Sequence, residues 1–201
     1  MKDYLIIDDW YTNSELVDIH KELDFLSTTQ GVKTQETEGG AKLDGKHLAN
    51  MHRYMPEQLY SSAITPINIT PINKALKKVQ NPEFHSKMES VFPESKSALG
   101  LNFSQTNNTH TVINYYENNE SYSKHFDVFQ YTMLIWLYKK PKSFKGGDLT
   151  FDSMNKTIEC KYNRMILFPS WYWHSVSEVK ELKKSGHGRW CITHFFYTTP
   201  K

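Results

Sequence analysis

The stretch YSKHFDVF, residues 122–129, places a histidine and an aspartate on either side of one phenylalanine. The run reads as a β-strand, in which successive side chains point to opposite faces. His125 and Asp127 are therefore expected to share a face, while Phe126 points the other way. Imidazole nitrogens and carboxylate oxygens both bind metal ions, so the pair is either a solvated surface pair or two ligands of a metal.

A third candidate ligand is His174, which ends the apolar run ILFPSWYWH. Because that run leads directly into a histidine on a predicted strand, His174 is expected to be buried, and a buried histidine must be hydrogen-bonded or bound to something. Two histidines and one carboxylate are the ligand set that holds non-haem Fe(II) and leaves other positions open. Structural zinc would need four ligands, with closely spaced Cys and His pairs that this sequence lacks.

Arg189 begins the strand-like run RWCITHFFY. Alternation predicts one face with Arg189, Cys191, Thr193 and Phe195, and an opposite face with Trp190, Ile192 and His194. A guanidinium that shares a face with cysteine and phenylalanine is expected to be buried, where it can pair with a carboxylate through two parallel hydrogen bonds. Arg189 therefore predicts an anchor for a dicarboxylate. Lys183 and Lys184 are the alternative anchors, but KELKKSGHG reads as an exposed turn.

The elements that must position these residues change in character along the chain. Residues 3–10 predict a short strand, and residues 12–27 predict a helix that opens with Thr12 and Asn13 and carries Leu16, Ile19, Leu23 and Leu26 at helical spacing. Residues 28–48 are polar and predict a loop, and residues 57–92 predict helical pieces bounded by prolines. From residue 98 onward, short strand-like runs separated by turn residues predict strands near 98–105, 110–118, 122–129, 131–139, 147–152, 156–162, 164–170, 173–179 and 189–197.

Helices that precede a run of strands indicate an α+β chain, mainly β with buttressing helices. The 201 residues suit a single domain, in which residues 1–98 support a β core of residues 99–201 that carries the metal site. The net charge of +2 points to neither a nucleic-acid partner nor a membrane partner. The N-terminal run lacks a secretory apolar segment, and no stretch approaches ~20 apolar residues, so a cytoplasmic location is expected. The two cysteines argue against a disulfide scaffold.

Taken in order, the motifs resemble a known family. Tyr115-x6-Tyr122-x2-His125-x-Asp127, then GGDLTF, RMILFPSWYWHSV and GRWCITHFFY, are similar to the iron(II)- and 2-oxoglutarate-dependent dioxygenases, and within them to the prolyl 4-hydroxylase-like branch. The resemblance covers about residues 99–197 and implies a double-stranded β-helix, the jelly-roll or cupin-like core. It implies that His125, Asp127 and His174 bind Fe(II) as the catalytic centre.

The resemblance also implies the cosubstrates and their contacts. Arg189 would pair with the distal carboxylate of 2-oxoglutarate, Tyr115 would face the cosubstrate pocket, O2 would be consumed, and ascorbate would serve as reductant. Gly146 and Gly147 match the glycines that open the strand ending in Phe151. Two features depart from the pattern: collagen-type members use lysine as the anchor, and the connection from His174 to Arg189 is longer than usual.

Hydroxylation is the expected outcome, because halogenating relatives have a small residue in place of Asp127. Peptidyl proline, in a peptide or protein partner, is the substrate that the resemblance favours. A free amino acid or another small molecule is the second hypothesis, and a non-catalytic, cupin-type metal-binding protein is the third. Nucleic-acid demethylases of the family carry a second arginine where this chain has Phe195. The polar residues 28–48 are hypothesised to become ordered when substrate binds, either by folding over an extended peptide or by closing a small pocket.

Overall fold

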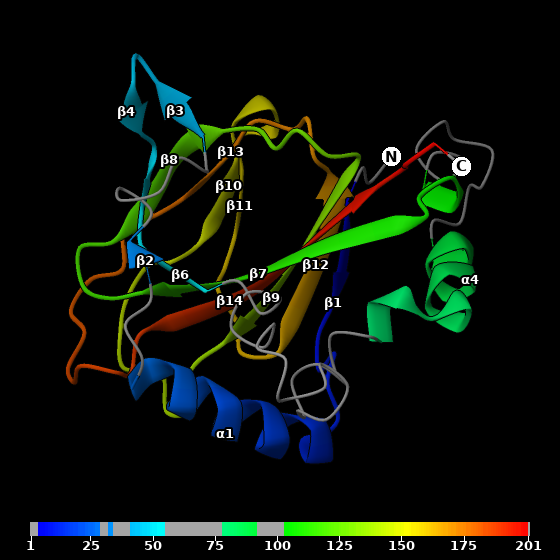
Figure 1. The fold of residues 1–201 in the computed structure, drawn as a ribbon. Coiled ribbons are helices and arrows are strands. Elements are labelled where there is room, and N and C mark those ends of the chain that lie inside the picture. Colours follow the sequence, from blue (N-terminus) through cyan, green and yellow to red (C-terminus); the bar gives the residue numbers. More distant parts are fainter. Residues whose placement is uncertain (1–3, 29–31, 34–40, 55–77, 92–102, 201) are drawn as a thin grey trace.

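The computed structural model describes residues 4–28, 32–33, 41–54, 78–91 and 103–200. Their strands form two antiparallel sheets and a small hairpin, with one helix along the outer face of the larger sheet and another near its end (Figure 1). The larger sheet has the order β1-β12-β9-β14-β7-β6-β2, and the smaller has the order β11-β10-β13-β8-β5. None of the described helices is both long and apolar enough to span a membrane.

The described helical elements are α1 (Asn13–Thr28), η2 (Lys78–Gln80), α4 (Pro82–Val91) and η3 (Asp152–Met154). The first six strands are β1 (Leu5–Ile7), β2 (Val32–Lys33), β3 (Lys42–Leu43), β4 (Lys46–His47), β5 (Ala49–Asn50) and β6 (His52–Tyr54). The remaining strands are β7 (Asn108–Tyr116), β8 (Ser121–His125), β9 (Tyr131–Leu137), β10 (Leu149–Phe151), β11 (Lys156–Ile158), β12 (Arg164–Pro169), β13 (His174–Val176) and β14 (Arg189–Tyr197).

Strands β7 to β14 are shared between the two sheets. The larger sheet takes β7, β9, β12 and β14, and the smaller takes β8, β10, β11 and β13. The chain thus passes repeatedly from one sheet to the other, which is the double-stranded β-helix. Helices support the outside of this core, so the predicted class, mainly β with buttressing helices, is confirmed.

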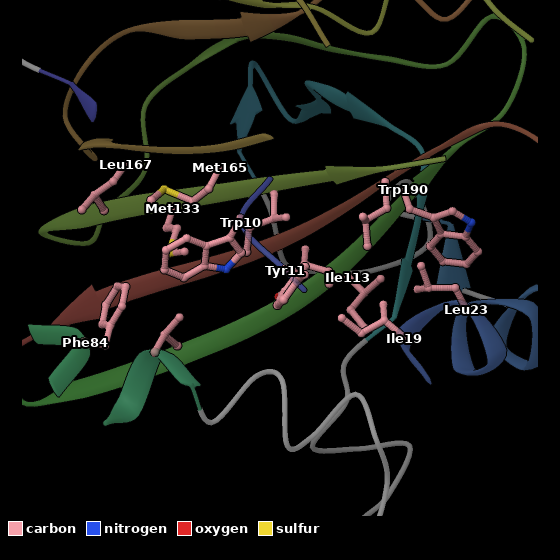
Figure 2. Close-up of a cluster of buried hydrophobic side chains, with 14 of the residues drawn as sticks. Trp10, Tyr11, Ile19, Leu23, Phe84, Ile113, Met133, Met165, Leu167 and Trp190 are labelled. Atoms are coloured by element: carbon pink, nitrogen blue, oxygen red, sulfur yellow. The ribbon is translucent and has the colours of Figure 1, made fainter. Parts of the chain in front are cut away.

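Two clusters of buried side chains flank the larger sheet. The outer cluster packs α1, α4 and the segment after β1 against the sheet, and Figure 2 shows Trp10 and Tyr11 among side chains of the strands. The inner cluster lies between the two sheets. On β14, Trp190 and Ile192 belong to the outer cluster and Cys191 to the inner one. The predicted alternation along β14 is therefore confirmed.

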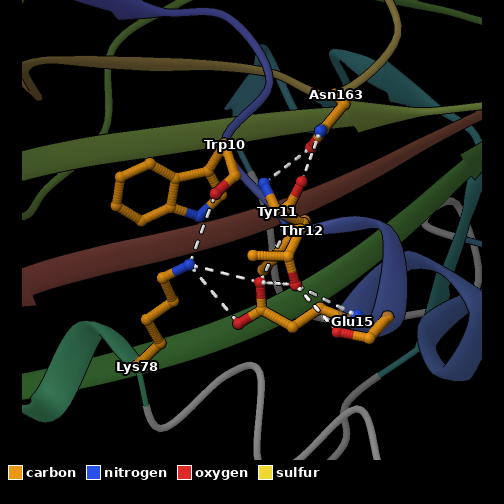
Figure 3. A network of polar contacts seen from close by, with 7 residues as sticks. Trp10, Tyr11, Thr12, Glu15, Lys78 and Asn163 are labelled. Atoms are coloured by element: carbon orange, nitrogen blue, oxygen red, sulfur yellow. Dashed lines mark hydrogen bonds and ion pairs between the residues drawn. The ribbon is translucent and has the colours of Figure 1, made fainter.

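Helix α1 forms where its apolar spacing predicts it, and all four of its predicted core positions are buried. Its first turn is capped reciprocally, because Thr12 Oγ1 accepts from the Glu15 amide at 3.3 Å while Glu15 Oε2 accepts from the Thr12 amide at 2.7 Å. Asn163 joins this end of the helix to the barrel through hydrogen bonds to both the amide and the carbonyl of Tyr11 (Figure 3). Lys78 Nζ lies 3.3 Å from Glu15 Oε1 and adds an ion pair.

Two predicted segments differ from the structure. Residues 103–105 form a helical turn, not a strand, and Phe103 packs in the outer cluster. Residues 41–48, predicted as part of a loop, contain the β3–β4 hairpin, and β5 and β6 follow it. Strands of two or three residues carry too short a pattern to be read from the sequence, since their partners define them. The rest of the predicted 28–48 loop beyond residues 32–33 and the helical pieces over 57–77 lie outside the described residues.

His194 is buried on the outer face of β14, where its Nδ1 lies 2.8 Å from Thr111 Oγ1. Burial lowers the pKa of His194 from 6.5 to about 3. Between pH 6.5 and about 3, the unfolded chain binds a proton at this histidine that the native protein excludes. The free energy of unfolding is therefore highest above pH 6.5 and falls as the pH falls towards 3. Each pH unit in the window costs about 1.4 kcal/mol of unfolding free energy.

His194→Asn is therefore expected to flatten the acid dependence of stability, because asparagine keeps a polar atom for Thr111 and does not titrate. Urea unfolding of both proteins at a series of pH values between 6.5 and 3 measures the difference in slope. Equal slopes would contradict the assignment of the acid sensitivity to His194.

Candidate metal and cosubstrate site

The structure brings His125, Asp127 and His174 together. His125 and His174 are direct cross-strand partners at the ends of β8 and β13. Asp127 follows β8, and its amide donates to the Ser170 carbonyl at 2.9 Å. One potential ligand atom from each residue lies within 4.8 Å of the others. Asp127 Oδ1 is 3.8 Å from His125 Nε2, and Asp127 Oδ2 is 3.6 Å from His174 Nε2.

Both imidazoles are oriented by backbone carbonyls. Nδ1 of His125 lies 2.8 Å from the Ser123 carbonyl, and Nδ1 of His174 lies 2.7 Å from the Tyr172 carbonyl. Because a carbonyl only accepts, each Nδ1 carries the proton and each Nε2 presents a lone pair towards Asp127. The arrangement is the one in which histidines bind metal ions.

Neighbouring side chains also hold the Asp127 carboxylate and the two imidazole rings in position. Thr132 Oγ1 donates to Asp127 Oδ2 at 2.6 Å and lies 2.8 Å from Ser170 Oγ. The Tyr122 ring stacks on His125 with centroids 3.5 Å apart, and Phe168 meets His174 edge-on at 5.0 Å. The donor atoms are therefore fixed before any ligand binds.

The electrostatics of this cluster suit a cation. Burial, reinforced by the neighbouring His174, lowers the pKa of His125 to about 3, so this imidazole is neutral at physiological pH. Burial also raises the pKa of Asp127 above its ordinary value, since the described surroundings compensate its charge only in part. Imidazole nitrogens beside an under-compensated carboxylate fit a divalent ion such as Fe(II).

Arg189 is fully buried at the start of β14, as its predicted position on the strand implies. Its carbon Cζ lies 4.6 Å from the centre of the Tyr116 ring and 5.4 Å from that of Trp136. None of its three guanidinium nitrogens has a well-formed hydrogen bond to a described residue. Besides these two rings, the thiols of Cys160 and Cys191 interact with it, and burial keeps both thiols protonated by raising their pKa. Thiols are weak acceptors, so within the described part of the chain the charge lacks a strong hydrogen-bond partner.

Such a guanidinium fits an anionic ligand. An arginine stays charged when buried, and an unpaired buried charge is costly. The inner cluster contains Tyr116 and Trp136, which contact Arg189, together with Tyr122 and Phe168, which contact the two histidines. Arg189 and the His-Asp-His group thus open on the same interior, which suits a ligand with a carboxylate at one end and metal-binding oxygens at the other.

Gly147 makes room for this arginine. A Cβ at Gly147 would lie 2.6 Å from Arg189 Cδ, and the residue has φ of +73°, which L side chains rarely adopt. The Gly-Gly pair noted in the sequence therefore has a physical reason beside the site. By contrast, Lys183 and Lys184, the alternative anchors, are exposed in the connection before β14, as predicted for that turn.

The ring of Tyr115 lies on the outer side of the larger sheet, not on the expected side. Its cross-strand partner is Trp190, its ring packs on Trp190 at 4.4 Å in the outer cluster, and its hydroxyl donates to Glu117. Because side chains alternate along β7, the neighbouring Tyr116 is the one that faces the interior and contacts Arg189. The expected place of Tyr115 in the cosubstrate pocket is thus wrong, and Tyr116 occupies that side.

Sequence reasoning missed several other residues around the site. Thr132 and Ser170 position Asp127, and Arg53 on β6, whose Nε donates to Asn114 Oδ1 at 3.1 Å, adds a second positive charge that acts on His125 and Asp127. Arg53 comes from the N-terminal half, for which only a supporting role was predicted. Its pairing with β7 is a long-range contact that no local pattern reveals.

Solved structures with this fold include prolyl hydroxylases. One is a prolyl-4-hydroxylase from Pseudomonas putida (14% identity, 98% of this chain and 94% of that chain, TM-score 0.61). A second is a prolyl hydroxylase from Trichoplax adhaerens in complex with a hypoxia inducible factor peptide fragment (14% identity, 98% of this chain and 84% of that chain, TM-score 0.62). A third is the viral collagen prolyl hydroxylase of Paramecium Bursaria Chlorella virus-1 in its 2OG complex (14% identity, 97% of this chain and 95% of that chain, TM-score 0.55). At this identity the likeness shows the fold alone.

Sequence comparison finds a family that the second half of the chain matches. No curated protein matches the chain. The family model described as the 2OG-Fe(II) oxygenase superfamily matches residues 110–197, a span that contains all three residues of the His-Asp-His group and Arg189. This region, which forms most of the β7–β14 barrel, matches the 2OG-Fe(II) oxygenase superfamily.

Proposed function

We propose that this oxygenase hydroxylates peptidyl proline, with Fe(II) bound by His125, Asp127 and His174 and 2-oxoglutarate anchored by Arg189. The observation that carries the cofactor assignment is the fully buried, poorly paired guanidinium that opens on the same interior as the three candidate ligands. With iron and 2-oxoglutarate bound, such a centre couples the oxidative decarboxylation of the 2-oxo acid by O2 to C–H hydroxylation.

The side chains of the site have separable tasks in this proposal. His125 and His174 present Nε2 lone pairs because the Ser123 and Tyr172 carbonyls hold their Nδ1 protons. Asp127 supplies the anionic ligand, oriented by Thr132. Arg189 holds the distal carboxylate through charge-assisted hydrogen bonds. The surrounding rings of the inner cluster exclude water from the reacting groups.

The rim beside the three ligands supports a peptide substrate. Apolar side chains that are adjacent in sequence to the ligands, or close to them, remain exposed: Phe126 (45%), Val128 (85%), Trp171 (47%) and Trp173 (45%). Phe126 and Trp173 meet edge-on with ring centroids 5.0 Å apart. Aromatic surfaces of this kind bind proline in extended segments. The prolyl hydroxylases of the same fold are consistent with this substrate class.

The test begins with anaerobic Fe(II) and 2-oxoglutarate, monitored for a visible metal-to-ligand charge-transfer band. We expect a band only when both are present. O2 is then admitted and succinate is measured with a proline-rich peptide and with a matched peptide in which alanine replaces every proline. Extra succinate and a mass gain of one oxygen with the first peptide alone support the proposal. The absence of the band would overturn the cofactor assignment, and equal succinate with both peptides would overturn the substrate class.

A further inference from the structure

The connection between β13 and β14 must deliver Arg189 to the interior. It contains the longer-than-usual run noted in the sequence. Its first half is tied by backbone hydrogen bonds at Ser177, Val179 and Lys180, and beyond Lys180 the backbone hydrogen bond to another segment is that of the Lys183 amide to the Ser143 carbonyl. Several of its residues, including Lys183 and Lys184, are exposed. A connection of this kind is mobile unless other residues hold it.

Side chains from three residues hold its last residues: Ser143 Oγ donates to the His187 carbonyl at 3.2 Å, and Tyr115 and Glu117 bind the neighbouring amides. Glu117 Oε1 accepts from the Gly186 amide at 2.9 Å and from the Tyr115 hydroxyl at 2.5 Å. The Tyr115 hydroxyl in turn accepts from the Gly188 amide at 3.0 Å. The two amides on either side of His187 are thus joined, through Tyr115 and Glu117, to the end of β7. The residue that follows Gly188 is Arg189.

The fit at Gly188 is close. A Cβ at this position would overlap the Tyr116 carbonyl and would lie 3.0 Å from the Tyr115 hydroxyl. Arg189 then pairs with Tyr116 across the strands. The backbone entering β14 is therefore pressed against β7 at the point where Tyr115 and Glu117 bind it.

The guanidinium depends on that backbone for its position. It lacks a strong hydrogen-bond partner among the described residues, so packing against Tyr116, Trp136 and Gly147 and the path of its own main chain place it. A bidentate contact with a carboxylate loses most of its value when its geometry shifts by about 1 Å.

We propose that Tyr115 and Glu117 are positioning residues that set the preference of this oxygenase for a 2-oxo acid with a distal carboxylate, by fixing the chain immediately before Arg189. This inference rests on the proposed function, in which Arg189 binds that carboxylate. The tyrosine lies in the outer cluster, the glutamate accepts from its hydroxyl, and neither belongs to the His-Asp-His group.

The experiment compares 2-oxoglutarate with pyruvate, which has the same metal-binding end but no distal carboxylate. Each is titrated anaerobically into the Fe(II)-loaded protein, and the charge-transfer band reports its dissociation constant. We expect Tyr115→Phe and Glu117→Ala each to weaken 2-oxoglutarate binding roughly tenfold, the worth of about one lost hydrogen bond at a charged site. Pyruvate binding and Fe(II) binding are expected to stay unchanged, so the preference for 2-oxoglutarate falls by the same factor.

Two further variants separate positioning from general stability. Glu117→Gln keeps an acceptor oxygen and is expected to retain most of the preference. Thr111→Val removes a buried hydrogen bond on the outer face of the same strand pair, far along β7 from Arg189, and is expected to lower the melting temperature without changing the preference. Because Glu117 is only partly buried, its variants remain informative even where Tyr115→Phe does not fold.

The outcomes are distinct. A wild-type preference that survives in both Tyr115→Phe and Glu117→Ala would overturn this inference alone, and so would an equal loss of affinity for both 2-oxo acids. A wild-type protein that binds iron but shows no preference for 2-oxoglutarate over pyruvate would overturn the role of Arg189 in the proposed function, and this inference with it.

Discussion

His174→Ala is expected to leave the protein without stable Fe(II) binding and without turnover. The wild-type site presents two oriented imidazoles and one carboxylate, and removal of one imidazole leaves a bidentate site with weak hold on a divalent ion. Loss of an outer partner of a metal ligand typically costs 10–100-fold in affinity. Loss of a ligand itself is expected to cost more than about 100-fold. Iron content after anaerobic loading and dialysis measures the effect directly.

The matched control for this substitution is His20→Ala. His20 lies on α1, half-buried, with Nε2 2.8 Å from the Tyr162 hydroxyl and no part in the His-Asp-His group. The His20→Ala variant loses an imidazole and a hydrogen bond but is expected to keep the full iron content and the full succinate production of the wild-type protein. Retention of stoichiometric iron by folded His174→Ala would show that the metal is held elsewhere.

The fold was predictable where a local pattern coincides with tertiary burial. Helix α1 follows from apolar residues at helical spacing with a cap in front, and both signals lie within its own residues. The strands of the barrel follow from apolar runs separated by turn residues. Strands β3 to β6 were missed because each has only two or three residues and exists through its partner. Residues 103–105 read as strand but fold as a helical turn over the outer cluster.

The site was predictable to the extent that its residues form an ordered motif. His125, Asp127, His174 and Arg189 lie in the second half of the chain, and the structure brings the first three together while burying the fourth on the expected face. The choice between Tyr115 and Tyr116 depends on which of two adjacent side chains faces inward. A shift of one residue reverses that face, and only the cross-strand pairing of Arg189 with Tyr116 decides it.

The same logic explains why Arg53 escaped notice. Its place near the histidines comes from pairing between β6 and β7, strands that are far apart in sequence. The residues next to Arg53 in the sequence do not distinguish it from an ordinary solvated arginine. A charged residue near a site can be predicted from the sequence only when it belongs to the motif that contains the other residues of the site.

Arg189→Met is expected to have two opposite effects, and their combination identifies a functional residue. Binding of 2-oxoglutarate should weaken by about 2–4 kcal/mol, since the distal carboxylate would enter a buried site without its charge-assisted partner. The unfolding free energy of the protein without cosubstrate should rise by about 1–3 kcal/mol, because a buried charge that lacks a strong partner is replaced by an apolar side chain of similar length. Calorimetric or charge-transfer titration measures the first effect, and urea unfolding without ligand measures the second.

Arg164→Met provides the contrast for this prediction. Arg164 is well paired, with Nε 2.6 Å from Asp8 Oδ1 and Nη2 3.1 Å from Asp8 Oδ2. Arg164, together with Lys161, lowers the pKa of Asp8 to about 2. Its removal takes the bidentate partner from Asp8 and leaves only the exposed contact of Lys161 Nζ with Asp8 Oδ2 at 2.7 Å, so stability should fall while 2-oxoglutarate binding is retained. A fall in stability for Arg189→Met as well would show that the protein itself satisfies the buried guanidinium. The opposite signs expected for two arginines of one barrel follow from their partners: Arg164 pairs with Asp8 within the chain, whereas Arg189, in the proposed function, pairs with the cosubstrate carboxylate.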